Sequence, residues 1–183
     1  MECSSFVTAL QFIEAHSYYF PSCDYLKATQ VDPFFTESAR RKLVHMIFEL
    51  GNAYGFEPST CVLALTYLER YLSFTPVSLS DLQLLASTCF FIASKVDESS
   101  CGFKLRLDDL AALSGQSFEP NAILTTEKTI MCALDHRLLD VTLIQIIDLL
   151  ISSLPHFASK TQRQPSYTSE HPQLRPVCFI LFD

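Results

Sequence analysis

The chain has few of the residues that interrupt helices. Its 183 residues include four glycines and nine prolines, while 49% belong to the hydrophobic class. Long aliphatic stretches with so few breakers favour helices over a turn-rich β-sandwich. A chain of this length and apolar content can bury a core, and the length is that of one domain with part of a second. The expected fold class is therefore all-α.

Positive charge is also scarce. The sequence has 13 Lys and Arg against 20 Asp and Glu, a formal net charge of −7. This balance argues against nucleic-acid binding through bulk charge and against a polybasic membrane anchor. The N-terminus lacks the basic head of a signal peptide, and we expect no apolar run of about 18 residues that could cross a bilayer. Neither nucleic acid nor membrane is an expected partner.

Paired cysteines and metal-ligand motifs are missing as well. The seven cysteines are odd in number and none are spaced CxxC, while the five histidines form no HExxH pair. We therefore expect reduced thiols that act as small apolar residues, in the nucleus or the cytoplasm, and no metal or other cofactor.

Motifs for catalysis are absent. The sequence contains no GxGxxG or GxxxxGK[ST] phosphate loop and no GxSxG elbow. The adjacent carboxylates Asp108 and Asp109 do not face each other on a helix, so they are not an acid–base pair. A Cys/His hydrolase is a weak alternative, because buried cysteines make poor nucleophiles. An all-helical binding module without catalytic activity is what remains.

Apolar residues at helical spacing predict a series of helices. The segment at residues 21–36 is expected to be extended or turn-like, and residues 158–183 are polar and predicted to be disordered. The predicted helices cover residues 4–16, 37–54, 58–74, 80–95, 107–113, 120–135 and 143–154.

The helix predicted over residues 37–54 is amphipathic, and Gly51 and Gly55 are expected to favour its end. Its inward-facing residues recur three or four apart and are Leu43, Met46, Ile47, Leu50 and Tyr54.

The next two helices carry boundary signals. Pro58 suits the first turn of a helix on which Glu69 and Arg70 are expected to face outward. Ser80, followed three residues later by Gln83, is the pattern of a capping box at the start of the third helix. Residues 82–93 are apolar or small nearly all round, which predicts a central helix that others surround.

With these helices in place, the chain resembles the cyclin box, a five-helix module that activates cyclin-dependent kinases. The most specific match is ALTYLERYLSFTPVSLSDLQLLASTCFFIASKVDE, residues 64–98. YYFPSCDYLKATQ (18–30), RRKLVHMIFEL (40–50) and ILTTEKTIMCALDHRL (123–138) resemble the approach segment, first helix and fifth helix of the family. The match is somewhat closer to G1 cyclins of the D group. It implies a short N-terminal helix and approach segment (1–36), a cyclin box (37–138), the first helix of an incomplete second repeat (139–157) and a polar tail (158–183).

The resemblance implies a kinase-binding surface. Lys95 and Glu127 match paired charges that lie close together in cyclins and bind backbone groups of the kinase. Val96, Met131 and Leu138 match neighbouring apolar contacts. Lysine offers three donors and an ionised glutamate offers only acceptors, so the pair can hold a peptide loop without recognising its side chains. A cyclin-dependent kinase is therefore the expected partner.

A second implied surface is the groove by which many cyclins recruit kinase substrates and inhibitors. Leu43, Met46, Glu49 and Gln83 match its positions. The pattern departs from the family at Met46, where a Trp is usual, and at Lys42, where an aliphatic residue is usual. Because aromatic anchors dominate such pockets, these departures weaken the expectation of docking.

Two further hypotheses stay open from the sequence. The same helical module occurs in adaptors for transcription or signalling that bind without activating a kinase. Thr75-Pro76 has the form of a proline-directed phosphorylation site, although a helix end followed by a turn explains it better.

Overall fold

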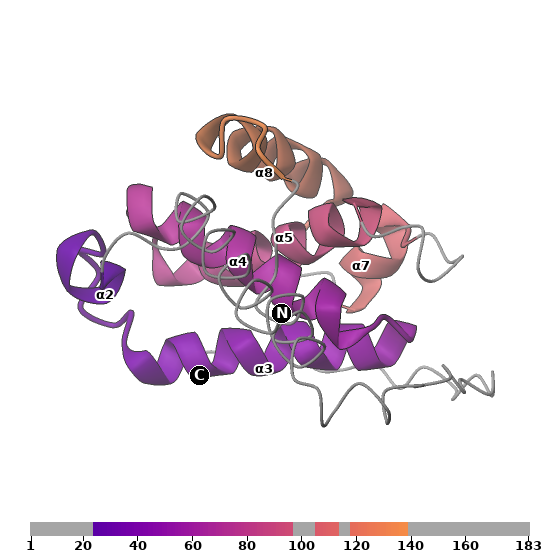
Figure 1. Ribbon diagram of the computed structural model, residues 1–183, viewed down its shortest axis with the longest axis horizontal. Helices are drawn as coiled ribbons and strands as arrows, with labels where there is room; N and C mark the ends of the chain where they lie inside the picture. The colour runs from indigo at the N-terminus through magenta and orange to yellow at the C-terminus, as the bar shows by residue number, and fades with distance from the viewer. Residues whose placement is uncertain (1–23, 97–104, 114–117, 139–183) are drawn as a thin grey trace, which may run out of the picture.

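The computed structural model describes residues 24–96, 105–113 and 118–138, and within them every regular element is a helix (Figure 1). The predicted all-α fold with five principal helices is confirmed. The predicted helices at residues 4–16 and 143–154, and the tail at 158–183, lie outside the described residues. The elements are α2 (Tyr25–Ala28), α3 (Glu37–Tyr54), α4 (Pro58–Phe74), the 3₁₀ turn η2 (Leu79–Asp81), α5 (Leu82–Val96), α7 (Leu107–Leu113) and α8 (Pro120–Ala133).

Helix α5 is the centre of the bundle, as its sequence predicts. Every residue from Leu85 to Ser94 is buried, as is Leu82. The helix packs against α3, α4 and α8, and in Figure 1 α3 and α8 lie on opposite sides of α4 and α5. A helix that is apolar nearly all round has no stable place at the surface, so burial on every side is what fixes its position.

The apolar segment around α5 is longer than predicted, because no apolar run of about 18 residues was expected. Leu79–Val96 has the length and composition of a helix that could cross a membrane, and 61% of it is buried inside the protein. The core helix of a globular domain meets the same criteria. Its packing against three helices accounts for its apolar character here.

Helices α3 and α4 approach closely at one glycine. A Cβ atom on Gly51 would lie 2.2 Å from Cys61 Sγ, far inside van der Waals contact. Gly51 therefore lies inside α3 and allows α4 to pack closely against it, and the prediction that Gly51 favours the helix end is wrong. Gly55 does end α3, with a left-handed φ of 70° and its amide donating back to carbonyls of the last turn.

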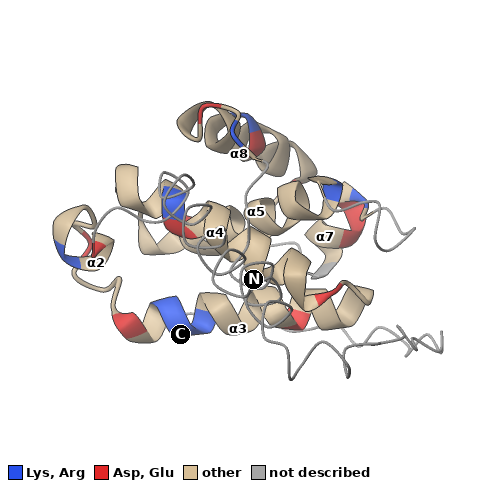
Figure 2. Cartoon of the chain, viewed as in Figure 1, with Lys and Arg blue, Asp and Glu red and all other residues tan. Residues whose placement is uncertain are grey.

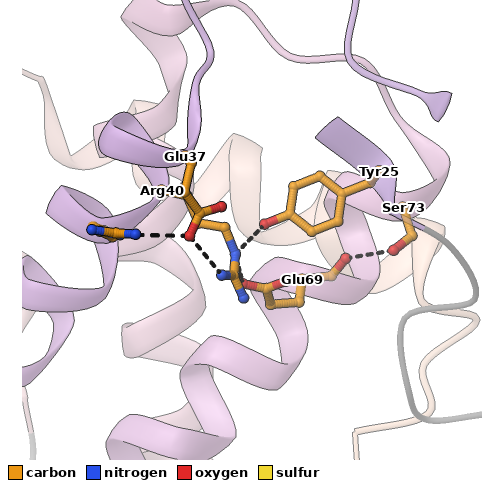
Figure 3. Close-up of polar contacts among 6 residues, drawn as sticks. Tyr25, Glu37, Arg40, Glu69 and Ser73 are labelled. Carbon is orange, nitrogen blue, oxygen red and sulfur yellow. Dashed lines mark hydrogen bonds and ion pairs between the residues drawn. The ribbon is translucent and has the colours of Figure 1, made fainter. Parts of the chain in front are cut away.

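The outward placement predicted for Glu69 and Arg70 is wrong. Arg70 is 2% exposed, and Nη1 donates to the carbonyl oxygen of Arg137 at 2.9 Å. Glu69 accepts a hydrogen bond at 2.8 Å from Arg40 Nε, which also donates to the Tyr25 hydroxyl at 2.9 Å (Figure 3). Both side chains of α4 therefore tie neighbouring segments to it.

The electrostatics of this network follow from its geometry. The hydrogen bond to Glu69 raises the pKa of Arg40 above its ordinary value, so the guanidinium stays charged. Burial, reinforced by the Glu69 carboxylate, raises the pKa of Tyr25, so its hydroxyl stays protonated. The arrangement joins α2, α3 and α4 and fixes their relative positions.

The segment before α3 contains the one-turn helix α2, where an extended or turn-like chain was expected. Residues after α2 form hydrogen bonds with the end of α4 and the residues that follow it. Gln30 Nε2 donates to the carbonyl oxygens of Leu72 at 2.8 Å and Thr75 at 2.9 Å, while its Oε1 accepts from the amide of Val77 at 2.9 Å. Thr29 Oγ1 donates to the Ser73 carbonyl at 3.0 Å. These bonds satisfy carbonyls that a helix C-terminus leaves without partners.

The start of α5 differs from the predicted capping box. The Ser80 hydroxyl lies 2.8 Å from the Ser78 hydroxyl, and the chain enters α5 through η2. The amide of Leu79 donates to Asp32 Oδ2 at 3.1 Å, so an aspartate 47 residues earlier supplies the acceptor. Local sequence patterns predict a cap from nearby residues and miss one that the fold brings from a distance.

Candidate functional site

Lys95 and Glu127 meet because α5 and α8 pack against each other. On α8, Ile123 and Ile130 are fully buried, and Glu127 lies between them at helical spacing on the same side. Lys95 lies in the last turn of α5, directly after the buried run. The long aliphatic stem of Lys95 lets its ammonium reach the Glu127 carboxylate at the rim of the interface.

The geometry of the pair agrees with the sequence prediction that the two groups lie side by side. Lys95 Nζ is 2.6 Å from Glu127 Oε1, and the side chains are 48% and 18% exposed. The ammonium also lies 4.0 Å from the centroid of the Phe91 ring, one turn earlier on α5. Charge-assisted hydrogen bonds are short and strong, so the carboxylate and the ring together hold the ammonium at the surface.

Apolar side chains accompany the pair. Val96 follows Lys95, Met131 lies one turn beyond Glu127 on α8, and Leu138 follows α8. All three are half-buried and pack against the core, so each presents part of its surface to solvent. The Leu138 carbonyl oxygen accepts a hydrogen bond from the Tyr67 hydroxyl, which fixes the chain as it leaves α8.

The residues predicted for a substrate groove differ in accessibility. Leu43 and Met46 are each 1% exposed, so their side chains belong to the core. Glu49 is half-buried, with Oε1 3.6 Å from His45 Nδ1. Gln83 is half-buried, and its Nε2 atom is buried with no hydrogen-bond acceptor within the described residues. Docking at these positions would require Leu43 and Met46 to become accessible, and it stays a prediction.

Of the three cysteines among the described residues, Cys132 on α8 is exposed and the other two are buried. Cys61 and Cys89 are buried, and burial raises the pKa of Cys61 to about 11 and that of Cys89 further, which keeps both protonated at neutral pH. Across the described ranges, no three His, Cys, Asp or Glu side chains gather where they could hold a metal ion. Figure 2 shows basic and acidic residues interspersed, with both kinds on α2, α3, α4 and α8.

Comparison with known proteins identifies the helical module. The model of the family described as "Cyclin, N-terminal domain" matches residues 8–139. The chain belongs to this family. The cyclin D2 of Gallus gallus, named G1/S-specific, is 31% identical over 139 residues, which cover 75% of this chain and 45% of that relative. The G1/S-specific cyclin-D1 of Homo sapiens is 30% identical over 142 residues, covering 78% and 46%.

These relatives agree with the predicted likeness to D-group cyclins. This cyclin chain spans less than half the length of the curated relatives it matches. The matched residues 8–139 contain all five principal helices and both members of the charged pair. The family assignment therefore covers the part of the chain that carries the candidate site.

Sequence reasoning missed two contributors around this site. Phe91 looks like one more apolar residue of a buried helix, and only the structure shows its ring beneath the Lys95 ammonium. Arg70 is adjacent to a glutamate in the sequence and has no local feature that signals burial. Its partner, the Arg137 carbonyl, is 67 residues away, so local spacing contains no sign of the contact.

Proposed function

We propose that the chain is a regulatory subunit that binds and activates a cyclin-dependent protein kinase in cell-cycle control. The observation that carries the proposal is the Lys95–Glu127 pair, with 2.6 Å between Nζ and Oε1, at the surface of a cyclin box. The G1/S-specific names of the relatives support a role in the cell cycle. The expected location is the nucleus or the cytoplasm.

The proposed mechanism is non-catalytic. A kinase transfers phosphate only when its regulatory helix is turned inward, so that a Lys–Glu ion pair and the metal site are complete. Lys95 would donate to carbonyl oxygens and Glu127 would accept from amides of the kinase backbone beside that helix. Val96, Met131 and Leu138 would bury apolar surface around these bonds, which excludes water and strengthens them.

An assay of kinase activation tests this proposal. Purified chain, added to a purified cyclin-dependent kinase that is inactive alone, is expected to raise phosphorylation of a peptide substrate well above the level given by the kinase alone. The variant K95A/E127A is expected to give little activation at the same concentration, because it loses both the donor and the acceptor proposed to bind the kinase backbone. R106A/D108A removes another exposed ion pair, with N–O distance 3.7 Å, and is expected to activate like wild type.

The outcomes separate the activator from the adaptor. A kinase that binds the chain and stays inactive would favour the adaptor hypothesis. Equal activation by wild type and by K95A/E127A would contradict the proposed role of Lys95 and Glu127 in kinase binding, even if the chain is an activator. Circular dichroism of each variant establishes that the helices are intact before the assay.

A further inference from the structure

The Lys95 ammonium has a second neighbour that the family resemblance does not include. Its Nζ atom lies 4.0 Å from the centroid of the Phe91 ring, well within the range in which a cation is attracted to an aromatic face. Phe91 is 4% exposed and belongs to the core side of α5, so the ring itself is held in place by packing. The ammonium is 2.6 Å from Glu127 at the same time.

Lysine needs such restraint if it is to act as a fixed donor. Its four-carbon stem has many rotamers, and ordering it on binding costs conformational entropy. A carboxylate alone holds one N–H group and leaves the stem free to move about that contact. An aromatic face one turn earlier on the same helix restrains the ammonium from a second direction, because side chains four residues apart on a helix are neighbours.

We infer that Phe91 is a positioning residue for kinase binding, acting through Lys95. The ring and Glu127 together hold the ammonium in one orientation before the partner arrives, so less entropy is lost when its remaining N–H groups bind backbone carbonyls. The expected effect of Phe91 on kinase binding rests on the proposed function. The restraint on Lys95 is a property of the free chain.

A double-mutant cycle tests the step through Lys95. F91L keeps an apolar side chain and removes the aromatic face. We expect F91L to weaken kinase binding about two- to tenfold in the wild-type background, the effect of having to order one flexible side chain on binding. In the K95M background, F91L is expected to have no further effect, because the group it positions is gone.

F90L is the matched control. Phe90 is the adjacent residue, fully buried, and its ring meets Phe56 edge-on at 5.4 Å between centroids. The substitution disturbs the core to a similar extent without touching Lys95. We expect any effect of F90L on binding to be the same in the wild-type and K95M backgrounds. An F91L effect that is equally large in both backgrounds would show a structural role and overturn the inference.

A measurement on the free chain tests the restraint on Lys95 independently of kinase binding, so failure of the inference can be told from failure of the proposed function. Protons above an aromatic face are shielded, so the NMR signals of the Lys95 ε-methylene group are expected upfield of those of an exposed lysine such as Lys27. They should return to the ordinary position in F91L and stay shifted in F90L. Ordinary shifts in the wild type would overturn the inference. Shifted signals without kinase binding would uphold the restraint and reject the proposed function.

Discussion

Replacing Gly51 with alanine is expected to destabilise the fold, although alanine is the better helix former. In a helix interior the change normally stabilises by about 0.5–1 kcal/mol. Here the new Cβ would lie 2.2 Å from Cys61 Sγ, and the sulfur can leave only by rotating into a packed core. Overpacking of this kind costs about 1–3 kcal/mol, so the clash outweighs the propensity. The free energy of unfolding, measured in urea, should fall by about 1–2 kcal/mol.

A second substitution identifies the cause. G51A/C61A removes the sulfur, and the added methyl group fills part of the space, so the double variant should be more stable than G51A alone. G55A is the matched control, because Gly55 has φ 70° and no atom within 4 Å of a Cβ. It should lose about 1 kcal/mol through backbone strain, and C61A should not rescue it. If C61A fails to improve G51A, the close approach of α3 and α4 is not the reason for the glycine.

Removing the Arg70 guanidinium, near the C-terminal end of α4, is expected to have a comparable effect. R70M keeps most of the aliphatic stem and loses the hydrogen bond to the Arg137 carbonyl. Hydrogen bonds from charged groups contribute about 1.5–3 kcal/mol, so the free energy of unfolding should fall by that amount. The turn after α8 contains two non-glycine residues with positive φ, Asp135 and His136, and it is the part that should loosen first.

Hydrogen exchange locates the effect. The amides of Asp135, His136 and Arg137 donate to carbonyls in the last turn of α8 and just beyond it, and their exchange should accelerate in R70M more than that of α5 amides. Y67F removes the hydroxyl that donates to the Leu138 carbonyl and should produce a smaller effect at the same place. Uniform acceleration throughout the bundle would show that Arg70 supports the whole core and not this turn in particular.

Helices with a clear apolar period could be predicted closely from the sequence. The bounds of Glu37–Tyr54 and Leu107–Leu113 are those expected, and Leu43, Met46, Ile47 and Leu50 are buried as predicted. The central position of α5 also followed from its composition. In each case one physical effect, the burial of apolar area, decides the outcome and is visible in local spacing.

Features decided by distant contacts could not be predicted in this way. Glu69 and Arg70 have the appearance of a solvated pair, yet each finds a partner from another segment that makes burial favourable. Gly51 resembles a helix stop until the sulfur of Cys61 is placed against it. Gln30 is a polar residue in a connecting segment, and its three hydrogen bonds to the end of α4 and the residues just after it depend on tertiary packing.

The candidate site shows the same division. The proximity of Lys95 and Glu127 followed from resemblance to cyclins, and the packing of α5 on α8 explains it. The spacing of residues within one helix cannot predict that two residues 32 positions apart lie close together. The four groove residues came from the same resemblance, and the burial of Leu43 and Met46 is a property of this chain that only its packing reveals.

Kinase affinity measured by calorimetry tests most directly whether the charged pair holds the partner. Hydrogen bonds made by charged groups contribute about 1.5–3 kcal/mol each, and those of a half-exposed pair contribute toward the lower end. K95A/E127A should therefore raise the Kd roughly 30-fold or more, while R106A/D108A leaves it unchanged. A Kd for K95A/E127A within twofold of wild type, with the helical fold intact, would contradict the proposed role of Lys95 and Glu127.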